Sequence, residues 1–152
     1  MNLLLIGMPA WSEQVVIVNA NRAVDVISQD EVINIFMGRY RKLPDGTIVY
    51  PLDLRGDSDA RRSFYRKLLD KVLAEINAYW ARLVFSGRTT PPAILDSQQA
   101  VVNKVAGDAA VIGYVEPRPG IPPSPGHTID LIGEMKRQNV KILLVEPYFD
   151  LK

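Results

Sequence analysis

Short runs of β-branched residues alternate along this chain with amphipathic segments that begin at a capping side chain. Strands that alternate with helices are typical of α/β folds. A length of 152 residues suits one domain. The sequence therefore predicts an α/β lobe and excludes an all-helical or all-β fold. We expect strands over Val15–Val18, Thr47–Leu54 and Val111–Val115, and helices over residues 29–37, 59–69, 73–85 and 97–106.

The expected helix boundaries rest on capping residues and on the apolar period. Ser28 and Glu31 have the spacing of a capping box, in which each side chain accepts a hydrogen bond from the other residue's amide. The apolar residues between Phe64 and Val84 recur at helical spacing and would lie on nearly one face of a helix. This apolar stripe fits one long helix or two helices with a break near Asp70. Two helices have alternative caps, Asp57 or Ser58 for residues 59–69 and Asp96 or Ser97 for residues 97–106.

The composition excludes several functions. The chain has 18 Lys and Arg against 17 Asp and Glu, a net charge of +1, which is too balanced for a dedicated nucleic-acid binder. It has no cysteine, which excludes disulfides, cysteine zinc sites and thiol catalysis. No apolar run reaches the ~18 residues needed to span a membrane. Because no phosphate-binding glycine loop or Ser/His/Asp set is present, we expect a non-enzymatic protein without a cofactor.

The two ends of the chain differ from its middle. Residues 1–12 hold a short apolar run followed by Ala10 and Ser12, the small-residue spacing of a signal-peptidase site, so they are interpreted as a truncated export signal. The alternative is a buried first strand or a disordered start. Five of the eleven prolines lie in Glu116–Pro125, which predicts an extended linker. A helix over Ser124–Gln138 and a strand over Lys141–Val145 follow, so we divide the chain into residues 1–12, 13–115 and 116–152.

Basic side chains gather along the central helices and offer two interpretations. They are Arg61, Arg62, Arg66, Lys67, Lys71, Arg82 and Arg88. They could form a patch for nucleic acid or anionic lipid. A solvated face opposite the apolar stripe explains them more simply, and we expect no nucleic acid as a partner. Tyr79 and Trp80 could stack on a ligand, but at helical spacing among leucines we expect them in the core.

Five segments carry a family resemblance. They are Val15–Asn19, Ile35–Arg39, Leu43–Gly46, Ala78–Gly87 and Val111–Val115. Through them residues 13–115 resemble the short relatives of the phosphate-binding proteins of bacterial ABC importers. The resemblance implies a periplasmic-binding-protein-like (type II) single lobe with a C-terminal helix–strand extension, in a periplasmic or secreted, non-enzymatic protein. It also implies inorganic phosphate or a similar oxyanion as the ligand, and the membrane component of an ABC importer as a candidate partner.

The tail resembles a different family. Through Gly113–His127 and Val145–Asp150, residues 112–152 are similar to an internal fragment of the zinc- and manganese-binding proteins of another class of ABC importer. A metal site usually needs three or four ligands. Only three acids are suggestively placed around the single histidine, and the resemblance carries no ligand role over to His127. We therefore expect no metal site. The three acids are Glu116, Glu146 and Asp150.

The best candidate site is the turn from Arg55 to Arg62, where an expected strand gives way to a helix. Free amides and the positive dipole end at a helix N-terminus attract anions, and an arginine adds bidentate hydrogen bonds. In the phosphate-binding relatives the matching turn is an Arg followed by a Ser-Gly-Thr-like cap. The resemblance therefore assigns Arg55 and Ser58 to anion binding, with Arg61 beside them.

The turn also departs from the family. Asp57 and Asp59 put two negative charges where the anion would lie, and no glycine follows Ser58. One interpretation is a weak or vestigial oxyanion site. The other is an ordinary capped helix whose acidic residues complement its dipole. Without a ligand, the lobe would instead be an interaction module that docks a partner protein through an apolar face left uncovered where a second lobe would lie.

Overall fold

The computed structural model describes residues 14–116 and 131–146 of the chain. The expected export signal, the proline-rich linker and the start of the expected tail helix lie outside the described residues. His127 and Asp150 lie outside them as well.

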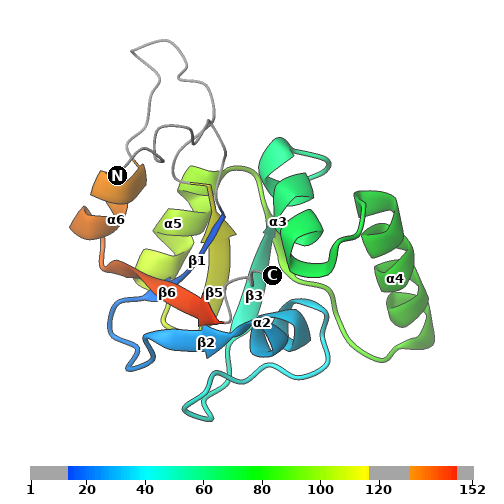
Figure 1. Ribbon diagram of the computed structural model, residues 1–152, viewed down its shortest axis with the longest axis horizontal. Helices are drawn as coiled ribbons and strands as arrows, with labels where there is room; N and C mark the ends of the chain where they lie inside the picture. Colours follow the sequence, from blue (N-terminus) through cyan, green and yellow to red (C-terminus); the bar gives the residue numbers. More distant parts are fainter. Residues whose placement is uncertain (1–13, 117–130, 147–152) are drawn as a thin grey trace, which may run out of the picture.

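A six-stranded mixed sheet forms the centre of the fold (Figure 1). Strand β1 is antiparallel to its neighbours β5 and β6, whereas the pairs β2–β6, β3–β5 and β3–β4 are parallel. Five strands therefore run in one direction, and their carboxyl ends lie along one edge of the sheet. In the spatial order of the sheet, the strands are β2 (Val26–Ser28), β6 (Val140–Glu146), β1 (Val15–Asn19), β5 (Val111–Val115), β3 (Tyr50–Leu54) and β4 (Ala93–Leu95).

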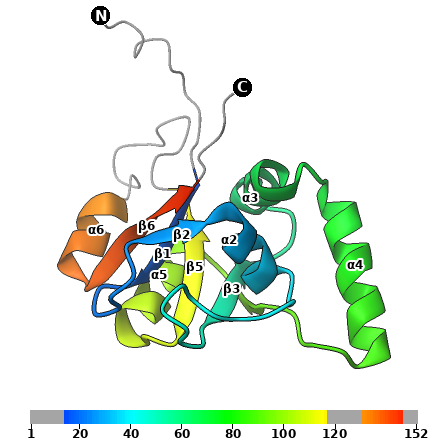
Figure 2. The same cartoon turned by 60° about the horizontal axis from the view of Figure 1, so that its bottom comes forward.

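Helices cover both faces of the sheet and make three layers (Figure 2). They are α2 (Gln29–Phe36), α3 (Asp59–Leu69), α4 (Leu73–Ser86), α5 (Gln98–Gly107) and α6 (Leu131–Arg137). Helices α2 and α3 lie on one face, and α5 lies on the other with α6 beside it. None of the helices in the described part of the chain is both long and apolar enough to cross a membrane.

The alternation of side chains in β5 shows which helices lie on which face. Gly113 and Tyr114 point to opposite faces because successive strand residues alternate. A Cβ atom at Gly113 would lie only 2.6 Å from Cγ1 of Val101 in α5, so the missing side chain lets α5 approach the sheet. On the other face, the Tyr114 ring stacks on Phe64 of α3 at 3.8 Å between centroids and meets Phe36 of α2 edge-on.

The expected break in the long apolar stripe is confirmed. Helix α3 ends at Leu69, Asp70 adopts a left-handed conformation with φ 57°, and α4 begins at Leu73. The left-handed residue turns the chain, so α4 lies at one end of the molecule (Figures 1 and 2).

The C-terminal turn of α2 anchors α4. The Tyr79 hydroxyl donates to the Met37 carbonyl at 2.6 Å. Trp80 lies against Gly38, where a Cβ atom would come within 2.7 Å of its ring and where φ is 74°. Trp80 is buried in the core, as expected from its spacing, and Tyr79 is half-buried against it.

The described part of the tail is built into the sheet. Strand β6 lies between β1 and β2, pairing Leu143 with Val16 and Leu144 with Val26. Leu143 is 2% exposed, and Met135 of α6 is also buried in the core. The strand expected over residues 141–145 is confirmed, with one further residue at each end. Of the helix expected over residues 124–138, the described residues contain α6.

The structure differs from the sequence prediction at three short strands. The prediction of a strand over Thr47–Leu54 was wrong about where the strand begins. Strand β3 begins three residues later, at Tyr50. The Asp45 carboxylate accepts from the Thr47 amide at 3.0 Å and from its hydroxyl at 2.6 Å, which holds Thr47 in the preceding turn. The sequence analysis also missed β2 and β4, which have three residues each.

Candidate anion-binding site

A hollow of about 290 Å³ opens at the carboxyl edge of the sheet. It lies where β3, β4 and β5 end and where α3 and α5 begin. Ligands of open α/β sheets bind at this edge. Two of the predicted site residues, Arg55 and Ser58, line the hollow. Among the residues that the structure describes, the lining is Leu54, Arg55, Ser58, Asp59, Ala60, Asp96, Ser97, Gln98 and Glu116.

Two helix N-termini meet at this hollow. Ser58 caps α3, its hydroxyl oxygen accepting from the Arg61 amide at 3.2 Å, and Ser97 caps α5 by accepting from the Ala100 amide at 3.1 Å. The first two amides of a helix have no acceptor within it, so both ends present N–H groups and positive dipole charge. In α3 these amides belong to Asp59 and Ala60, and in α5 to Gln98 and Gln99.

Arg55 reaches across the hollow to Asp96. Its Nε donates to Asp96 Oδ1 at 2.8 Å, and its Nη2 contacts the same oxygen. Both side chains are largely exposed. The carboxylate of Asp96 therefore occupies the position on the guanidinium where an external anion would bind. An exposed ion pair contributes only about 0–1 kcal/mol, so a competing anion can replace it.

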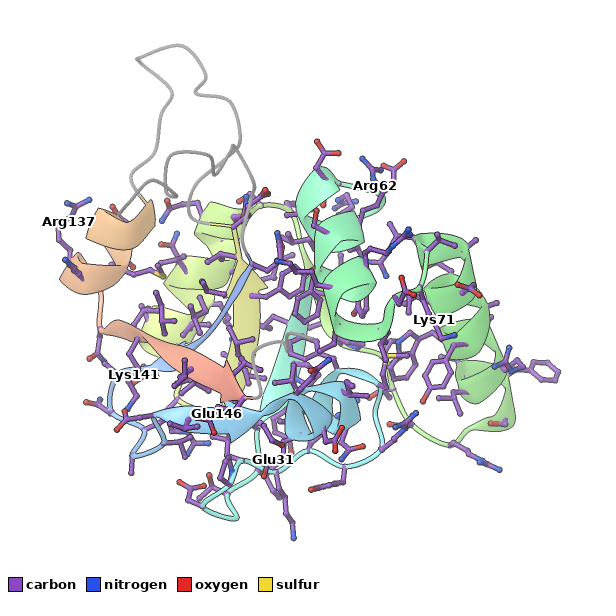
Figure 3. The ribbon with its side chains drawn as sticks, viewed as in Figure 1. Glu31, Arg62, Lys71, Arg137, Lys141 and Glu146 are labelled. Atoms are coloured by element: carbon purple, nitrogen blue, oxygen red, sulfur yellow. The ribbon has the colours of Figure 1, made fainter. Side chains whose placement is uncertain are left out.

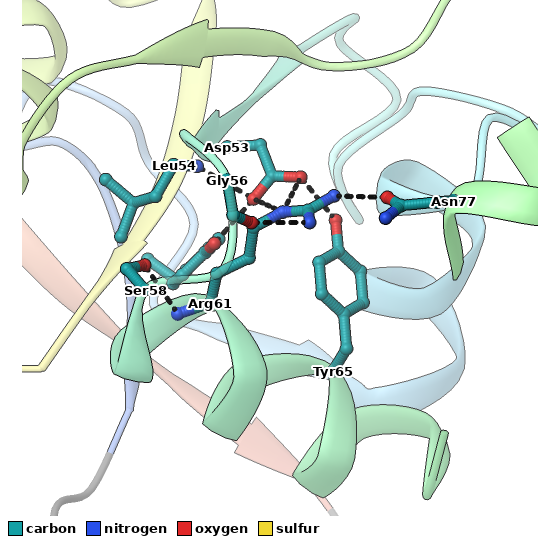
Figure 4. A network of polar contacts seen from close by, with 8 residues as sticks. Asp53, Leu54, Gly56, Ser58, Arg61, Tyr65 and Asn77 are labelled. Carbon is teal, nitrogen blue, oxygen red and sulfur yellow. Dashed lines mark hydrogen bonds and ion pairs between the residues drawn. The ribbon is translucent and has the colours of Figure 1, made fainter. Parts of the chain in front are cut away.

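Arg61 does not join Arg55 and Ser58 at the hollow, because its side chain turns into the protein (Figure 4). Its Nε lies 3.2 Å from both carboxylate oxygens of the buried Asp53. Its Nη1 donates to the Gly56 carbonyl at 2.9 Å. Only the backbone amide of Arg61 takes part in the cap of α3.

Asp53 is the centre of a buried polar network. Besides Arg61, its carboxylate accepts from the Tyr114 hydroxyl at 2.5 Å, the Tyr65 hydroxyl at 2.9 Å and the Leu54 amide at 2.8 Å. A buried charge is tolerated when it is both paired and hydrogen-bonded. These bonds tie β3 to β5 and α3, and through Arg61 they fix the turn that carries the predicted site.

The two tyrosines of the network are held in their protonated form. Burial raises the pKa of Tyr65 well above its ordinary value, and the negative charge of Asp53 raises it further. Burial and Asp53 raise the pKa of Tyr114 in the same way. Each hydroxyl therefore remains a hydrogen-bond donor to Asp53 at any physiological pH.

The charges that line the hollow are mostly negative. Among the described lining residues Arg55 is the one basic side chain, against Asp59, Asp96 and Glu116. Asp59 is paired with Arg62 at the rim. The two helix dipoles offset part of this negative charge. An oxyanion would thus find good donors here, together with carboxylates that oppose it.

The basic side chains on α3 form a face of mixed charge. Figure 3 labels Arg62 near the start of α3 and Lys71 just beyond its end, and both side chains are exposed. Arg62 pairs with Asp59, and Arg66 pairs with Asp70 at 3.3 Å. With acidic partners interspersed and Arg61 buried, this face fits the solvated interpretation.

The metal-binding alternative gains no support from the part of the chain that the structure describes. Within residues 14–116 and 131–146, no group of three or more His, Asp or Glu side chains could hold a metal ion. Of the four suggestive tail residues, Glu116 and Glu146 are described. Glu116 follows strand β5, and Glu146 ends strand β6.

Sequence reasoning missed half of the hollow. Asp96 and Ser97 were identified only as alternative helix caps, and their approach to Arg55 depends on β3 and β4 being neighbours. Asp53 was also missed, although an acidic residue between Leu52 and Leu54 in an apolar strand is a signal for a buried charge that requires a partner.

Solved structures of phosphate-binding proteins share this fold. An ABC-type phosphate transport receptor from Vibrio cholerae matches with TM-score 0.60 and 12% identity, over 92% of this chain and 48% of that one. A putative phosphate ABC transporter substrate-binding protein from Clostridium perfringens matches with TM-score 0.58 and 15% identity, over 89% and 45%. PstS from Borrelia burgdorferi matches with TM-score 0.60 and 12% identity, over 92% and 49%.

These likenesses define the class of fold. The chain spans about half the length of the proteins that it matches. It has the α/β fold of one lobe of a periplasmic-binding-protein-like structure, which confirms the fold expected from the family resemblance. No protein family model and no curated protein sequence matches the chain.

Proposed function

We propose that this chain is a non-enzymatic, solute-binding-protein-like lobe that binds a small oxyanion such as inorganic phosphate in the hollow between α3 and α5. The observation that carries the proposal is the meeting of two helix N-termini and Arg55 at the carboxyl edge of the sheet. The fold supports it as well, because one similar structure holds bound phosphate.

The proposal extends to location and partners. The matching proteins include substrate-binding proteins of ABC transporters. We accordingly propose a periplasmic or secreted location and the membrane component of an ABC importer as a candidate partner. The support for both is the shared fold.

Binding would proceed by exchange of one anion for another on Arg55. The oxyanion takes the place of the Asp96 carboxylate and accepts from Nε and Nη2 of Arg55. The Ser58 hydroxyl donates to it, since its oxygen already accepts from the Arg61 amide. The free amides of Asp59 and Ala60 complete the contacts on the α3 side.

We expect this binding to be weak. A single lobe encloses the anion on one side, so water competes on the other. The carboxylates of Asp59, Asp96 and Glu116 repel a second negative charge in the same hollow. Affinities in the millimolar range, corresponding to about 4 kcal/mol, are the expected result.

The test is a titration of the full chain with phosphate and, separately, sulfate, followed by amide NMR. We expect shifts confined to residues 55–62 and 96–99. Arg55→Ala should abolish them, and Asp96→Asn should tighten binding several-fold by removing the competing carboxylate. Arg66→Ala is the matched control, because Arg66 forms a comparable exposed pair at the other end of α3.

Two outcomes would contradict the proposal. One is saturable binding that survives Arg55→Ala, which would place the ligand elsewhere. The other is the absence of binding at millimolar phosphate in both the parent chain and Asp96→Asn, which would favour a partner-docking module.

A further inference from the structure

Helix α4 is apolar around most of its circumference. Its covered side packs on the lobe through Leu73, Ile76 and Trp80, all of which are buried. The opposite side is exposed, with Glu75 and Arg82 along one edge of it and Asn77 beyond the other edge. Helices that are apolar all round are normally buried all round. The exposed apolar residues are Ala74, Ala78, Ala81, Val84 and Phe85.

The exposed side of α4 ends in one large side chain. Phe85 is 93% exposed, whereas the exposed Val84 and Val72 lie on other sides of the helix. Figures 1 and 2 show α4 at one end of the molecule, with its outer side facing away from the sheet and the other helices. Apolar patches of this kind on a soluble protein mark interaction surfaces.

The sequence of α4 is complementary to itself in the antiparallel direction. Glu75 and Arg82 are seven residues apart, so they lie on the same edge of the helix, two turns from each other. Both lie equally far from the point midway between Ala78 and Tyr79. A two-fold axis through that point therefore brings Glu75 beside the partner's Arg82, and Arg82 beside the partner's Glu75.

The same axis also brings the exposed apolar stripes of the two helices together. Ala74, Ala78, Ala81 and Phe85 follow one another at spacings of four, three and four residues, so they lie on one face of the helix. In this register Phe85 lies near the partner's Ala74. Ala78 lies next to the axis, where its small side chain allows two helices to approach at about 8–10 Å. One register thus pairs both charges and covers the exposed apolar stripe that ends at Phe85.

The two charges are available for these contacts. Glu75 accepts from the Val72 amide at 3.2 Å, and the Arg82 Nη1 lies 3.5 Å from the Ala78 carbonyl. Neither side chain forms an ion pair with another residue in the part of the chain that the structure describes.

We propose that two copies of this chain dimerise through α4, packed antiparallel about a two-fold axis near Ala78. The contact has the length of one helix, about 21 Å for the 14 residues of α4. An interface of that length is smaller than a standard permanent one. The dimer is therefore weak and forms in the micromolar range. This surface lies apart from the anion-binding hollow, so either proposal can fail without the other.

The experiment is sedimentation velocity on the full chain, from low micromolar to several hundred micromolar concentrations. We expect a reversible monomer–dimer equilibrium. Phe85→Ser should weaken dimerisation at least about tenfold, because Phe85 is the one large apolar side chain that each copy contributes to this small interface. Circular dichroism should show an unchanged fold, since Phe85 has almost no contact with the lobe.

A charge swap tests the register. Arg82→Glu places like charges together at both ends of the contact and should weaken the dimer. Adding Glu75→Arg to Arg82→Glu restores opposite charges and should restore dimerisation. Arg66→Glu reverses the same charge on α3 and serves as the matched control.

Three results would overturn the proposal. The first is a parent chain that stays monomeric at the highest concentration. The second is a dimer that Phe85→Ser leaves unchanged. The third is a double charge variant that dimerises no better than Arg82→Glu alone, which would exclude the antiparallel register.

Discussion

Two arginines on one turn each bind an aspartate, yet the two pairs have opposite surroundings. The side chains of Arg61 and Asp53 are 8% and 2% exposed, and those of Arg55 and Asp96 are 66% and 75% exposed. Little solvent reaches the buried pair, so water competes only weakly for either partner. Around the exposed pair, water and dissolved anions compete with Asp96 at little cost. The same chemistry thus gives an anchor in one place and an exchangeable contact in the other.

The exposed pair also depends on the buried pair, whereas the buried pair does not depend on the exposed one. Arg61 donates to the Gly56 carbonyl and so holds the turn that follows Arg55. Arg55 makes no contact that would hold Asp53. Loss of the buried pair should therefore damage the exposed site, and loss of the exposed pair should leave the buried one intact.

Removal of the buried carboxylate should have the largest effect. We expect Asp53→Ala to lower the free energy of unfolding by about 3–5 kcal/mol, because it leaves the Arg61 charge buried without a partner. Urea denaturation measures this loss. The double variant Asp53→Ala with Arg61→Met should be more stable than Asp53→Ala alone. A loss below 1 kcal/mol for Asp53→Ala would mean that the pair is not an anchor.

The tyrosines around Asp53 should give the buried pair a signature in alkaline solution. Their pKa values are raised in the folded chain by burial and by Asp53, whereas in the unfolded chain they titrate near their ordinary value of about 10. Above that pH the unfolded state binds fewer protons than the folded state. Stability should therefore fall as pH rises through about 10 and beyond.

Tyr114→Phe separates this effect from general alkaline denaturation. The variant should lose about 1.5–3 kcal/mol at neutral pH, the contribution of a hydrogen bond to a charged group. Its stability should then fall less steeply above pH of about 10, because one of the titrating groups is gone. Unfolding followed by circular dichroism at stepped pH values provides the measurement. An unchanged slope would contradict the role given to Tyr114.

The exposed pair should have the smallest effect on stability. We expect Asp96→Ala to change the free energy of unfolding by less than about 1 kcal/mol, and the change should shrink further in high salt. Urea denaturation at low and high ionic strength would measure it. A loss as large as that of Asp53→Ala would show that Arg55 and Asp96 hold β3 to β4, and that an anion cannot displace Asp96.

The sequence predicts the architecture well, because the signals for it are local. The runs at β1 and β5 are β-branched and buried, and the Ser28–Glu31 capping box forms as its spacing predicts. The strands that were missed are short. In β2, Ser28 is both the last strand residue and the cap of α2. The sequence pattern at Ser28 indicates the start of the helix, and the end of the strand at the same residue has no pattern of its own.

The candidate site is predicted only in part, because half of it is assembled over long distances along the chain. Arg55 and Ser58 belong to one turn, and local spacing identifies them. Asp96 reaches Arg55 from 41 residues away, through the pairing of β3 with β4. No local pattern shows that Arg61 turns inward, since its direction is set by Asp53 in the neighbouring strand.

The place of β6 between β1 and β2 has a consequence for synthesis of the chain. During translation β1 and β2 leave the ribosome long before residues 140–146, which separate them in the finished sheet. Until then a nascent chain exposes one open edge of β1 and holds β2 without a strand neighbour. Open edges of this kind are where chains aggregate or recruit chaperones. The gap between β1 and β2 is therefore closed by β6, which leaves the ribosome after every other strand of the described part of the chain.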